Sequence, residues 1–496
     1  MRFTSLNATR RRLPRFLAGL GGLALLAVAC SDPPTTGDGG VRTALEDGEL
    51  PECPLDALEE AEGPVQATLW YGGLGGVTKR TMEETVERFN AGQDQVRLDA
   101  SDQGSSYAEV FRKYDSAASA SVDQLPDLIY LEDTQLQGMV DRGQVLPAEA
   151  CMEAAGYDIT DIEPAVRAKY TVDDVLYPGY VNVSTPVLYY NKAHWVEAGL
   201  DPDDPPGTLD EVYEQAKALK EAGVSERPFV LKNSRWFFET WLSGIDVDVV
   251  DNDNGRDAPA TEATFDTPET RELFEFLQRM NDEGLLNVFA NTEGSIDHYL
   301  ALAQEQSSMI VETSTASTTI ADTLAGEVTA AEAGVEFDES VVERANIVPA
   351  TAPFPGIESP GEVFVSGGTF YILNTSDPAQ QAAGWRFLEF MLQPENAREW
   401  HFSGSYLPAV KEVADDPQVQ EFWSGEVAGV LLANAVEQLE DADPDKAGPL
   451  IGPYPDFADE IEQAMDAILL GGADIESTLS SAEQRVTESL ERYNAE

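Results

Sequence analysis

Basic side chains are scarce in this chain of 496 residues. Lysine and arginine together number 31, against 90 aspartates and glutamates, and the formal net charge at pH 7 is −59. A surface of that sign repels phosphate backbones, so it excludes nucleic-acid binding through a basic patch. It is typical of a solvated exterior whose like charges resist aggregation.

Histidine is also scarce, since only His194, His298 and His401 are present and none lies in an HExxH pattern. A zinc hydrolase of that type is therefore excluded. The sequence lacks a GxSxG nucleophile elbow and a Walker loop. The glycine-rich stretch 72–76 does not continue as a dinucleotide fingerprint, because Thr78 stands where the third glycine belongs. No cofactor is predicted.

An acid-rich stretch around Asp251 and Asp253 resembles a calcium loop only in composition. An EF-hand with its central glycine at Gly255 needs an acid at one end and a glutamate at the other, where this chain has Val250 and Thr261. The stretch is predicted to be an acidic surface loop, and no metal site is predicted. A carboxylate pair for glycoside hydrolysis stays an open alternative, although no particular pair stands out.

Long hydrophobic runs are missing as well. The run FLAGLGGLALLAVA is shorter than the roughly 20 residues of a membrane-spanning helix, but it follows five arginines and no acid. Residues 1–29 are therefore predicted to be a signal peptide. The run ends at Cys30 in a pattern that resembles the lipobox of bacterial lipoproteins, which implies lipidation there. The alternative is an ordinary secretory signal followed by a chance cysteine.

The segment after Cys30 is rich in Pro, Gly, Ser, Thr and Asp, and residues 30–64 are predicted to be a lipid-anchored flexible tether. The protein is thus expected to be an exported cell-envelope lipoprotein, on the outer face of the cytoplasmic membrane or in the periplasm. With Cys30 lipidated, Cys53 and Cys151 remain as an even pair, and a structural disulfide between them is predicted for an oxidising compartment.

Apolar residues are plentiful, at 42% of the chain, yet one core rarely grows past about 250–300 residues, so two lobes are predicted. From residue 65 the pattern alternates between strands and helices. Strands are predicted over 65–71, 96–101 and 127–132, and helices over 78–90 and from 107 onward. This alternation predicts an α/β protein with parallel sheets covered by helices.

Several helices carry clear end signals. Thr208 and Glu211 form a capping box before an apolar stripe that ends at Gly223. The helix beginning near Thr267 has Pro268 in its first turn and stops at Gly284. Residues 382–392 are apolar nearly all round and are predicted to be buried, and 456–493 is predicted to form two amphipathic helices.

Five stretches carry a family resemblance: STPVLYYNKAHWVEAGLDPDDPPG at 184–207, FDTPE, QSSMIVETSTAS, SGGTFYIL, and FLEFMLQPENAREWHFSGSYLPAVKE. Together they resemble the extracellular solute-binding proteins of family 1, which deliver sugars and related solutes to ABC importers. Within the family, the likeness is nearest to the glycerol-3-phosphate-binding subunits, which share STPVLYYNK and the form WHxxxxYLP.

The resemblance implies a periplasmic-binding-protein type II fold, with two α/β lobes, a hinge and a ligand cleft between the lobes. The expected boundaries are 65–181 plus 313–370 for lobe 1 and 182–312 plus 371–496 for lobe 2. The chain is expected to cross between lobes near 182–185, 312–314 and 367–371.

The resemblance also implies a set of ligand-binding positions. The matching residues are Trp70, Tyr71, Tyr107, Glu132 or Asp133, Ser184, Trp236, Ser314, the backbone of Gly367 or Gly368, and Tyr406. Aromatic faces with acids and hydroxyls suit a sugar or polyol. Structural roles stay open: the tryptophans and Tyr71 could be core residues, the two serines could satisfy hinge backbone groups, and Tyr406 could brace a turn.

One departure from the family pattern bears on the ligand. Glycerol-phosphate binders place an arginine on the phosphate shortly before a GxxP turn, where this chain has Leu450 or a neighbour. Arg235 is left open as a substitute. The resemblance and this departure together predict a monomeric, non-enzymatic receptor that captures a neutral carbohydrate or polyol for ABC permease subunits. A binder of glycerol-3-phosphate or a phosphodiester, a secreted glycan-active hydrolase, and a scaffold lipoprotein without a small ligand are the alternatives.

Overall fold

A computed structural model describes residues 49–292, 297–325 and 347–495. The predicted signal peptide, Cys30 and the first part of the predicted tether lie outside these ranges. None of the helices in the described ranges combines the length and the apolar character that a membrane crossing requires.

The first sheet has six strands and organises what we call lobe 1. Its order is β2 (Val96–Asp102), β1 (Val65–Tyr71), β3 (Leu128–Glu132), β13 (Gly368–Leu373) and β4 (Val145–Leu146), with β7 (Tyr180–Val181) also paired to β13. β1 runs parallel to β2 and β3, whereas β13 runs antiparallel to its neighbours. The parallel strands confirm the predicted α/β class, and the predicted strand 65–71 matches β1.

Helices cover this sheet with their apolar faces. The helices of lobe 1 are α2 (Asp56–Glu59), α3 (Gly76–Gly92), α4 (Tyr107–Ala120), α5 (Leu136–Asp141), α6 (Ala148–Ala155), α7 (Pro164–Tyr170), α17 (Pro378–Leu392) and α18 (Pro394–Gly404). On α3, Met82, Val86 and Phe89 are buried, as the 3.6-residue period predicted. The short strands β5 (Thr171–Val172) and β6 (Val175–Leu176) form a hairpin after α7.

The second sheet has five strands and organises lobe 2. Its order is β10 (Leu286–Ala290), β9 (Phe229–Asn233), β11 (Met309–Thr313), β8 (Pro186–Asn191) and β12 (Pro349–Pro353). Successive residues of a strand point to opposite faces. Leu188 and Tyr190 accordingly pack in one core cluster, while Val187 and Tyr189 pack in the other.

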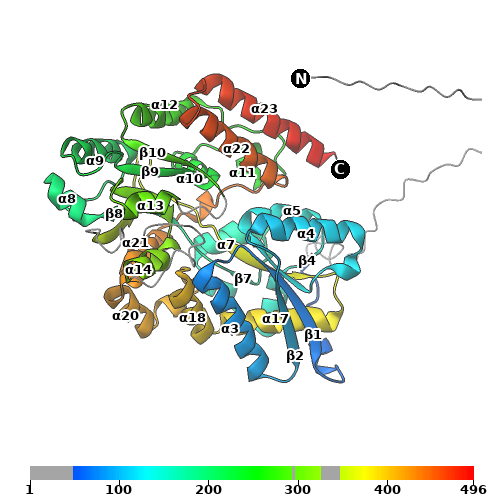
Figure 1. Ribbon diagram of the computed structural model, residues 1–496. Helices are drawn as coiled ribbons and strands as arrows, with labels where there is room; N and C mark the ends of the chain where they lie inside the picture. The colour runs from blue at the N-terminus through cyan, green and yellow to red at the C-terminus, as the bar shows by residue number, and fades with distance from the viewer. Residues whose placement is uncertain (1–48, 293–296, 326–346, 496) are drawn as a thin grey trace, which may run out of the picture. The chain divides into compact units, whose positions relative to one another are not determined.

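Lobe 2 takes most of the remaining helices: α8 (Lys192–Ala198), α9 (Leu209–Glu221), α10 (Arg235–Gly244), α11 (Asp251–Gly255), α12 (Pro268–Asp282), α13 (Asp297–Ala303), α22 (Tyr454–Leu469) and α23 (Ile475–Asn494). The predicted capping box at Thr208 and Glu211 starts α9, and Thr267 with Pro268 starts α12. The two predicted C-terminal helices are α22 and α23, which pack on each other and on α12 (Figure 1).

The expected lobe boundaries are wrong in two places. Residues 349–353 were expected in lobe 1, but β12 pairs with β8 in the sheet of lobe 2. Residues 371–404 were expected in lobe 2, but β13 pairs with β3, and α17 and α18 pack on lobe 1. Backbone pairing between distant strands decided both placements. Beyond the crossing expected at 312–314, the next described strand, β12, pairs in the sheet of lobe 2.

The chain reaches α22 from lobe 1 through a series of helices: α19 (Lys411–Ala414), α20 (Pro417–Gly425) and α21 (Val427–Glu440). The last of these packs on β12 and on α14 (Ala316–Ala325).

Two linking segments lie side by side where the chain passes between the sheets. The N–H of Ser184 donates to the carbonyl of Ser366 at 2.9 Å, and the N–H of Ser366 donates to the carbonyl of Ser184 at 3.0 Å. Gly367 has φ of +151°, and a Cβ there would lie 1.7 Å from the carbonyl oxygen of Asn182. Only glycine fits this close approach, so we call residues 182–185 and 366–367 the linker pair.

The described part of the predicted tether is not flexible chain. Residues 56–59 form α2, Cys53 and Leu58 are buried, and α2 packs against α17. Cys53 and Cys151 form a disulfide across 98 residues of sequence. This cross-link and the apolar contacts hold residues 49–64 on lobe 1, which corrects the expectation for that part of the tether.

Candidate ligand-binding site

A cluster of tyrosine hydroxyls lies at the end of β3 in lobe 1. The hydroxyls of Tyr107 and Tyr130 are 3.0 Å apart, and the Asn182 side-chain amide donates to Tyr130 at 2.5 Å. The Tyr406 hydroxyl also interacts with these three side chains. Trp400 donates from Nε1 to the Asn182 side-chain oxygen at 2.7 Å, which orients the amide. We call Tyr107, Tyr130, Asn182 and Tyr406 the tyrosine cluster.

Glycines make room for this cluster. A Cβ at Gly368 would lie 1.9 Å from the Tyr130 hydroxyl, and a Cβ at Gly73 would meet the backbone and ring of Tyr107 at 3.0–3.2 Å. Burial raises the pKa of Tyr107 and Tyr130 well above the usual value for tyrosine. The hydroxyls therefore stay protonated, and they offer a ligand neutral donors and acceptors.

Asp133 was expected to be a candidate acceptor for ligand hydroxyls, but the structure engages it internally. Its Oδ1 accepts from Ser366 Oγ at 2.8 Å and from the Gly367 N–H at 3.1 Å. Its Oδ2 lies 3.2 Å from the Lys169 ammonium, and both side chains are nearly fully buried. Asp133 therefore ties β3 and α7 to the linker pair and is not available to a ligand in this arrangement.

Ser184 and Ser314 also lie against the links between the lobes. Ser184 Oγ donates to the Ser366 carbonyl at 2.9 Å, and both serines are buried. The N–H of Ser314 donates to the carbonyl of Thr185 at 2.8 Å, and the Tyr189 hydroxyl donates to the Ser314 carbonyl at 3.1 Å. Gly367 contributes its backbone to Asp133, and the Gly368 carbonyl accepts from the Asn182 N–H at 2.8 Å.

Charged side chains of lobe 2 meet Glu132 of lobe 1, which is close enough to Tyr107 of the tyrosine cluster to raise its pKa. Arg235 begins α10, whose N-cap is Ser234, and its guanidinium reaches across to Glu132 of lobe 1 at 2.8 Å. The same guanidinium lies 3.2 Å from Glu462 of α22 and packs over the Tyr454 ring. Burial alone would lower the pKa of Arg235, but the carboxylates of Glu132 and Glu462 and the nearby Tyr454 raise it well above its usual value. The pair Glu132–Arg235 therefore joins the two lobes by charge.

Glu239 lies one turn after Arg235 on α10 and is 3% exposed. Its carboxylate accepts from the Tyr454 hydroxyl at 2.5 Å. Burial raises the pKa of Glu239 to about 7, although Tyr454, Arg235 and Lys169 each oppose the rise. Burial lowers the pKa of Lys169, and the negative charge of Asp133 opposes this decrease. We call Glu132, Arg235, Glu239, Tyr454 and Glu462 the ionic cluster.

The predicted aromatic residues differ in their positions. Trp236 follows Arg235 on α10, is partly buried and stacks on Phe237. Trp70 is partly buried at the end of β1 and packs on the core of lobe 1. Tyr71 is a core residue, 2% exposed, with its hydroxyl 3.4 Å from Glu83. Of these three, Trp236 is the one next to a residue of the ionic cluster along the chain.

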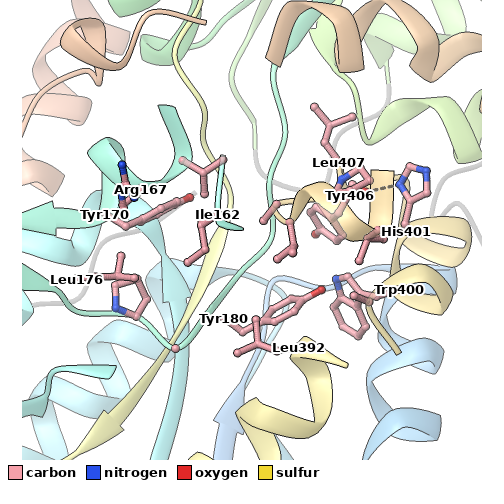
Figure 2. A pocket seen from close by; sticks show the side chains of 18 of the residues that line it. Ile162, Arg167, Tyr170, Leu176, Tyr180, Leu392, Trp400, His401, Tyr406 and Leu407 are labelled. Atoms are coloured by element: carbon pink, nitrogen blue, oxygen red, sulfur yellow. Dashed lines mark hydrogen bonds between the residues drawn. The ribbon is translucent and has the colours of Figure 1, made fainter. Parts of the chain in front are cut away.

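A separate apolar cavity lies within lobe 1, behind Tyr406. Figure 2 shows Tyr170, Ile162 and Leu176 on one side of it and Trp400 and His401 on the other. Its volume is about 40 Å³, which is room for a few water molecules but not for a sugar. The cavity is therefore not the site expected for the ligand.

His401 braces Tyr406 from this side. Its Nε2 accepts from Trp423 Nε1 at 2.9 Å, because an indole nitrogen can only donate. Its Nδ1 therefore carries the proton and donates to the Tyr406 carbonyl at 2.5 Å, the dashed line in Figure 2. Burial lowers the pKa of His401 to about 4, so the ring is neutral at pH 7. Tyr406 both belongs to the tyrosine cluster and braces the turn that follows it.

Sequence reasoning missed several residues of these clusters. They are Tyr130, Asn182, Glu239, Tyr454 and Glu462, and the nearby Lys169 was missed as well. Tyr130 lies within a continuous apolar run and reads as a core position, and Glu239 and Glu462 are two acids among 90. No local pattern distinguishes them. In the ranges that the structure describes, no three His, Cys, Asp or Glu side chains come together in a way that could hold a metal ion.

Comparisons with known proteins identify the family. A sequence profile of bacterial extracellular solute-binding proteins matches residues 84–424. The chain is 22% identical over 449 residues to the sn-glycerol-3-phosphate-binding periplasmic protein UgpB of Escherichia coli, covering 88% of this chain and 95% of UgpB.

Solved structures share the fold. The sugar-binding protein MalE of Xanthomonas citri has a TM-score of 0.67 at 18% identity and covers 87% of this chain and 98% of its own. UgpB of Mycobacterium tuberculosis, solved in complex with glycerophosphocholine, has a TM-score of 0.66 at 19% identity and covers 87% of this chain and 100% of its own. These likenesses confirm the predicted two-lobed fold. The profile spans more than half of the chain, so the protein belongs to the bacterial extracellular solute-binding proteins, whose role is to bind a solute rather than to catalyse a reaction.

Proposed function

We propose that this protein captures a neutral carbohydrate or polyol between its two lobes and delivers it to the permease of an ABC importer. The observation that carries the proposal is the meeting of two kinds of polar group at one place. The tyrosine cluster supplies neutral hydroxyls from lobe 1, and Glu132, Arg235 and Trp236 supply a carboxylate, N–H donors and an aromatic face. This mixture suits a solute with many hydroxyl groups.

The proposed site consists of Tyr107, Glu132, Trp236 and Tyr406, with Tyr130, Asn182 and Arg235 added from the structure. The protein would act as a monomer, held at the cell envelope by a lipid on Cys30. The linker pair would act as the hinge on which the lobes close over the solute.

A second candidate ligand is glycerol-3-phosphate or a related phosphodiester, which the names of the UgpB relatives favour. A phosphate binds best to an arginine that is free to form two parallel hydrogen bonds. Where the resemblance to the glycerol-phosphate binders implies that arginine, this chain has Leu450 or a neighbour, and Leu450 is an aliphatic side chain that is 6% exposed. The neutral ligand is therefore the first proposal.

Thermal unfolding with a panel of sugars, polyols and glycerophosphodiesters tests the proposal. A ligand at about 100 times its dissociation constant adds roughly 2.7 kcal/mol of stability, which gives a clear rise in Tm. Trp236→Ala should weaken binding of the ligand with the highest affinity, while Tyr213→Phe, which removes only a hydroxyl bonded to Glu283 at the surface, should leave that affinity unchanged. A panel without any shift would refute capture of a small solute, and steady release of reducing sugar from oligosaccharides would favour the hydrolase instead.

A further inference from the structure

Arg235 is engaged from both lobes in the described structure. Three carboxylates act on its guanidinium: Glu132 in direct contact from lobe 1, Glu462 in direct contact from α22, and Glu239 from its own helix. Two further cations lie nearby: Lys169 is paired with Asp133, and Arg256, close to Lys169, donates to the backbone carbonyls of Ala168, Ala447 and Gly448. Acids thus outnumber bases around Arg235, and among the described residues both Arg235 and Lys169 have a carboxylate partner.

This balance discriminates between ligands by charge. A phosphate or carboxylate that approached Arg235 would meet Glu132 and Glu462 at contact distance and would have to displace one of them. Like charges brought together in a partly buried place repel strongly, and such repulsion is a common source of specificity. A neutral solute meets no such penalty.

The same cluster also offers hydrogen bonds to a neutral ligand. Among the described residues, neither Arg235 Nε nor Trp236 Nε1 has a hydrogen-bond partner, although both atoms are buried. Buried N–H groups are nearly always satisfied in folded proteins, so two such donors on consecutive residues need an acceptor. Within the described ranges Glu132 Oε2 accepts only the Thr134 hydroxyl, at 3.1 Å, and has capacity for a further donor.

We propose that Glu132, Arg235 and Glu462 form a charge filter that admits neutral polyhydroxyl solutes and excludes phosphorylated ones. The hydroxyl and ether oxygens of the solute accept from Arg235 and Trp236, and one of its hydroxyls donates to Glu132. This inference rests on the proposed function and adds the residues that set the charge of its ligand.

Two substitutions that remove a charge without changing size test the filter. Glu132→Gln and Glu462→Gln each leave Arg235 with one carboxylate fewer in contact, and the double variant leaves it with neither. Isothermal titration with sn-glycerol-3-phosphate and with inorganic phosphate should detect no binding to the wild-type protein. Each single variant should bind sn-glycerol-3-phosphate measurably, at least about tenfold more tightly than the weakest affinity that the titration detects, and the double variant more tightly still.

Glu460→Gln is the matched control, because Glu460 lies on the same helix as Glu462 but pairs with Arg485 on the surface. It should behave as wild type. Cooperative thermal unfolding of each variant establishes that it is folded, and either single variant suffices for the test.

The outcomes separate the filter from the proposed function. The filter is overturned if wild-type protein binds sn-glycerol-3-phosphate as tightly as the variants do. It is also overturned if neither single variant nor the double variant gains affinity for sn-glycerol-3-phosphate. Maltose and ribitol, used as neutral probes, report on the proposed function independently. A gain in phosphate binding without binding of any neutral solute would leave the filter standing and remove the proposed ligand class.

Discussion

One glutamate, Glu239, is buried in the ionic cluster between the lobes, and another, Glu312, is buried at the end of β11. The pKa values of these two glutamates shift in opposite directions. Glu239 and Glu312 are both 3% exposed. Glu312 lies 3.1 Å from the Lys232 ammonium and 2.9 Å from His298 Nε2, and it accepts from the Thr313 N–H. Burial alone would raise the pKa of Glu312, but Lys232 and His298 hold it well below its usual range.

Glu239 has no cation in hydrogen-bond contact among the described residues. Only the neutral Tyr454 hydroxyl donates to it, and burial raises its pKa to about 7. Equal burial therefore gives opposite pKa shifts, and direct contact with a cation decides the sign. Glu312 therefore keeps its negative charge at neutral pH, whereas Glu239 can gain or lose its proton near neutral pH.

Glu312→Gln should have the largest effect on stability. The amide keeps the shape but leaves Lys232 and His298 without their carboxylate, and breaking a buried ion pair from one side costs about 4 kcal/mol. Because the pKa of Glu312 is lowered, its contribution is present at neutral pH and is lost as the pH falls below the usual glutamate range. Urea denaturation at pH 7 measures the cost, and exposed Glu283→Gln serves as control. A cost no larger than that of the control would contradict the prediction.

The effect of Glu239→Gln on stability should depend on pH in the opposite direction to the effect of Glu312→Gln. The folded pKa of Glu239 is raised from 4.5 to about 7, so its stabilising contribution is fully present below pH 4.5 and is lost as the pH rises through about 7. The stability of wild type relative to the variant should fall by about 1.4 kcal/mol per pH unit across that window. Urea denaturation at several pH values measures the difference, and a flat difference would show that the charge of Glu239 is already fixed.

Tyr454→Phe should lower the stability and raise the pKa of Glu239 further. It removes the hydroxyl that donates to Glu239, and an unsatisfied buried acceptor costs about 1–2 kcal/mol. Since that hydrogen bond lowers the pKa of Glu239, the titration window should move upward. A pH series of thermal unfolding checks both effects. An unchanged window would mean that Tyr454 does not govern the proton of Glu239.

Tyr107→Phe should have the smallest effect. It removes one hydroxyl from the tyrosine cluster, at a cost of about 1 kcal/mol or less. The pKa of Tyr107 is raised well above its usual value, so the cost should not vary with pH near neutrality. The same unfolding series measures this cost, and a clear slope between pH 4.5 and 7 would show that the tyrosine cluster is coupled to a titrating acid.

Local signals in the sequence predicted much of the fold. The capping box at Thr208, the proline and glycine that bound α12, and the period of α3 each act within one or two helical turns, and the structure contains all of them. The lobe assignment of 349–353 and 371–404 was wrong because it depended on which distant strands and helices each segment meets. Strand pairing is not encoded in the local pattern of either segment.

The candidate site was only partly predictable. The family resemblance indicated Tyr107, Trp236 and Tyr406; in the structure Tyr107 and Tyr406 belong to the tyrosine cluster, and Trp236 follows Arg235 of the ionic cluster on α10. The resemblance could not indicate that Asp133 is engaged by Lys169 and the linker pair. Glu132 and Arg235 are 103 residues apart, and Arg235 and Glu462 are 227 apart.

The sequence by itself determined the charge of the surface, the positions of most helices and the family, because composition, periodicity and motifs are properties of neighbouring residues. The tertiary structure alone decided which acids meet which bases. Glu239 and Glu312 have the same side chain, yet one faces a tyrosine and the other a lysine and a histidine. Electrostatic interactions depend on distance in space and on exclusion of water, and only the folded chain sets either of these.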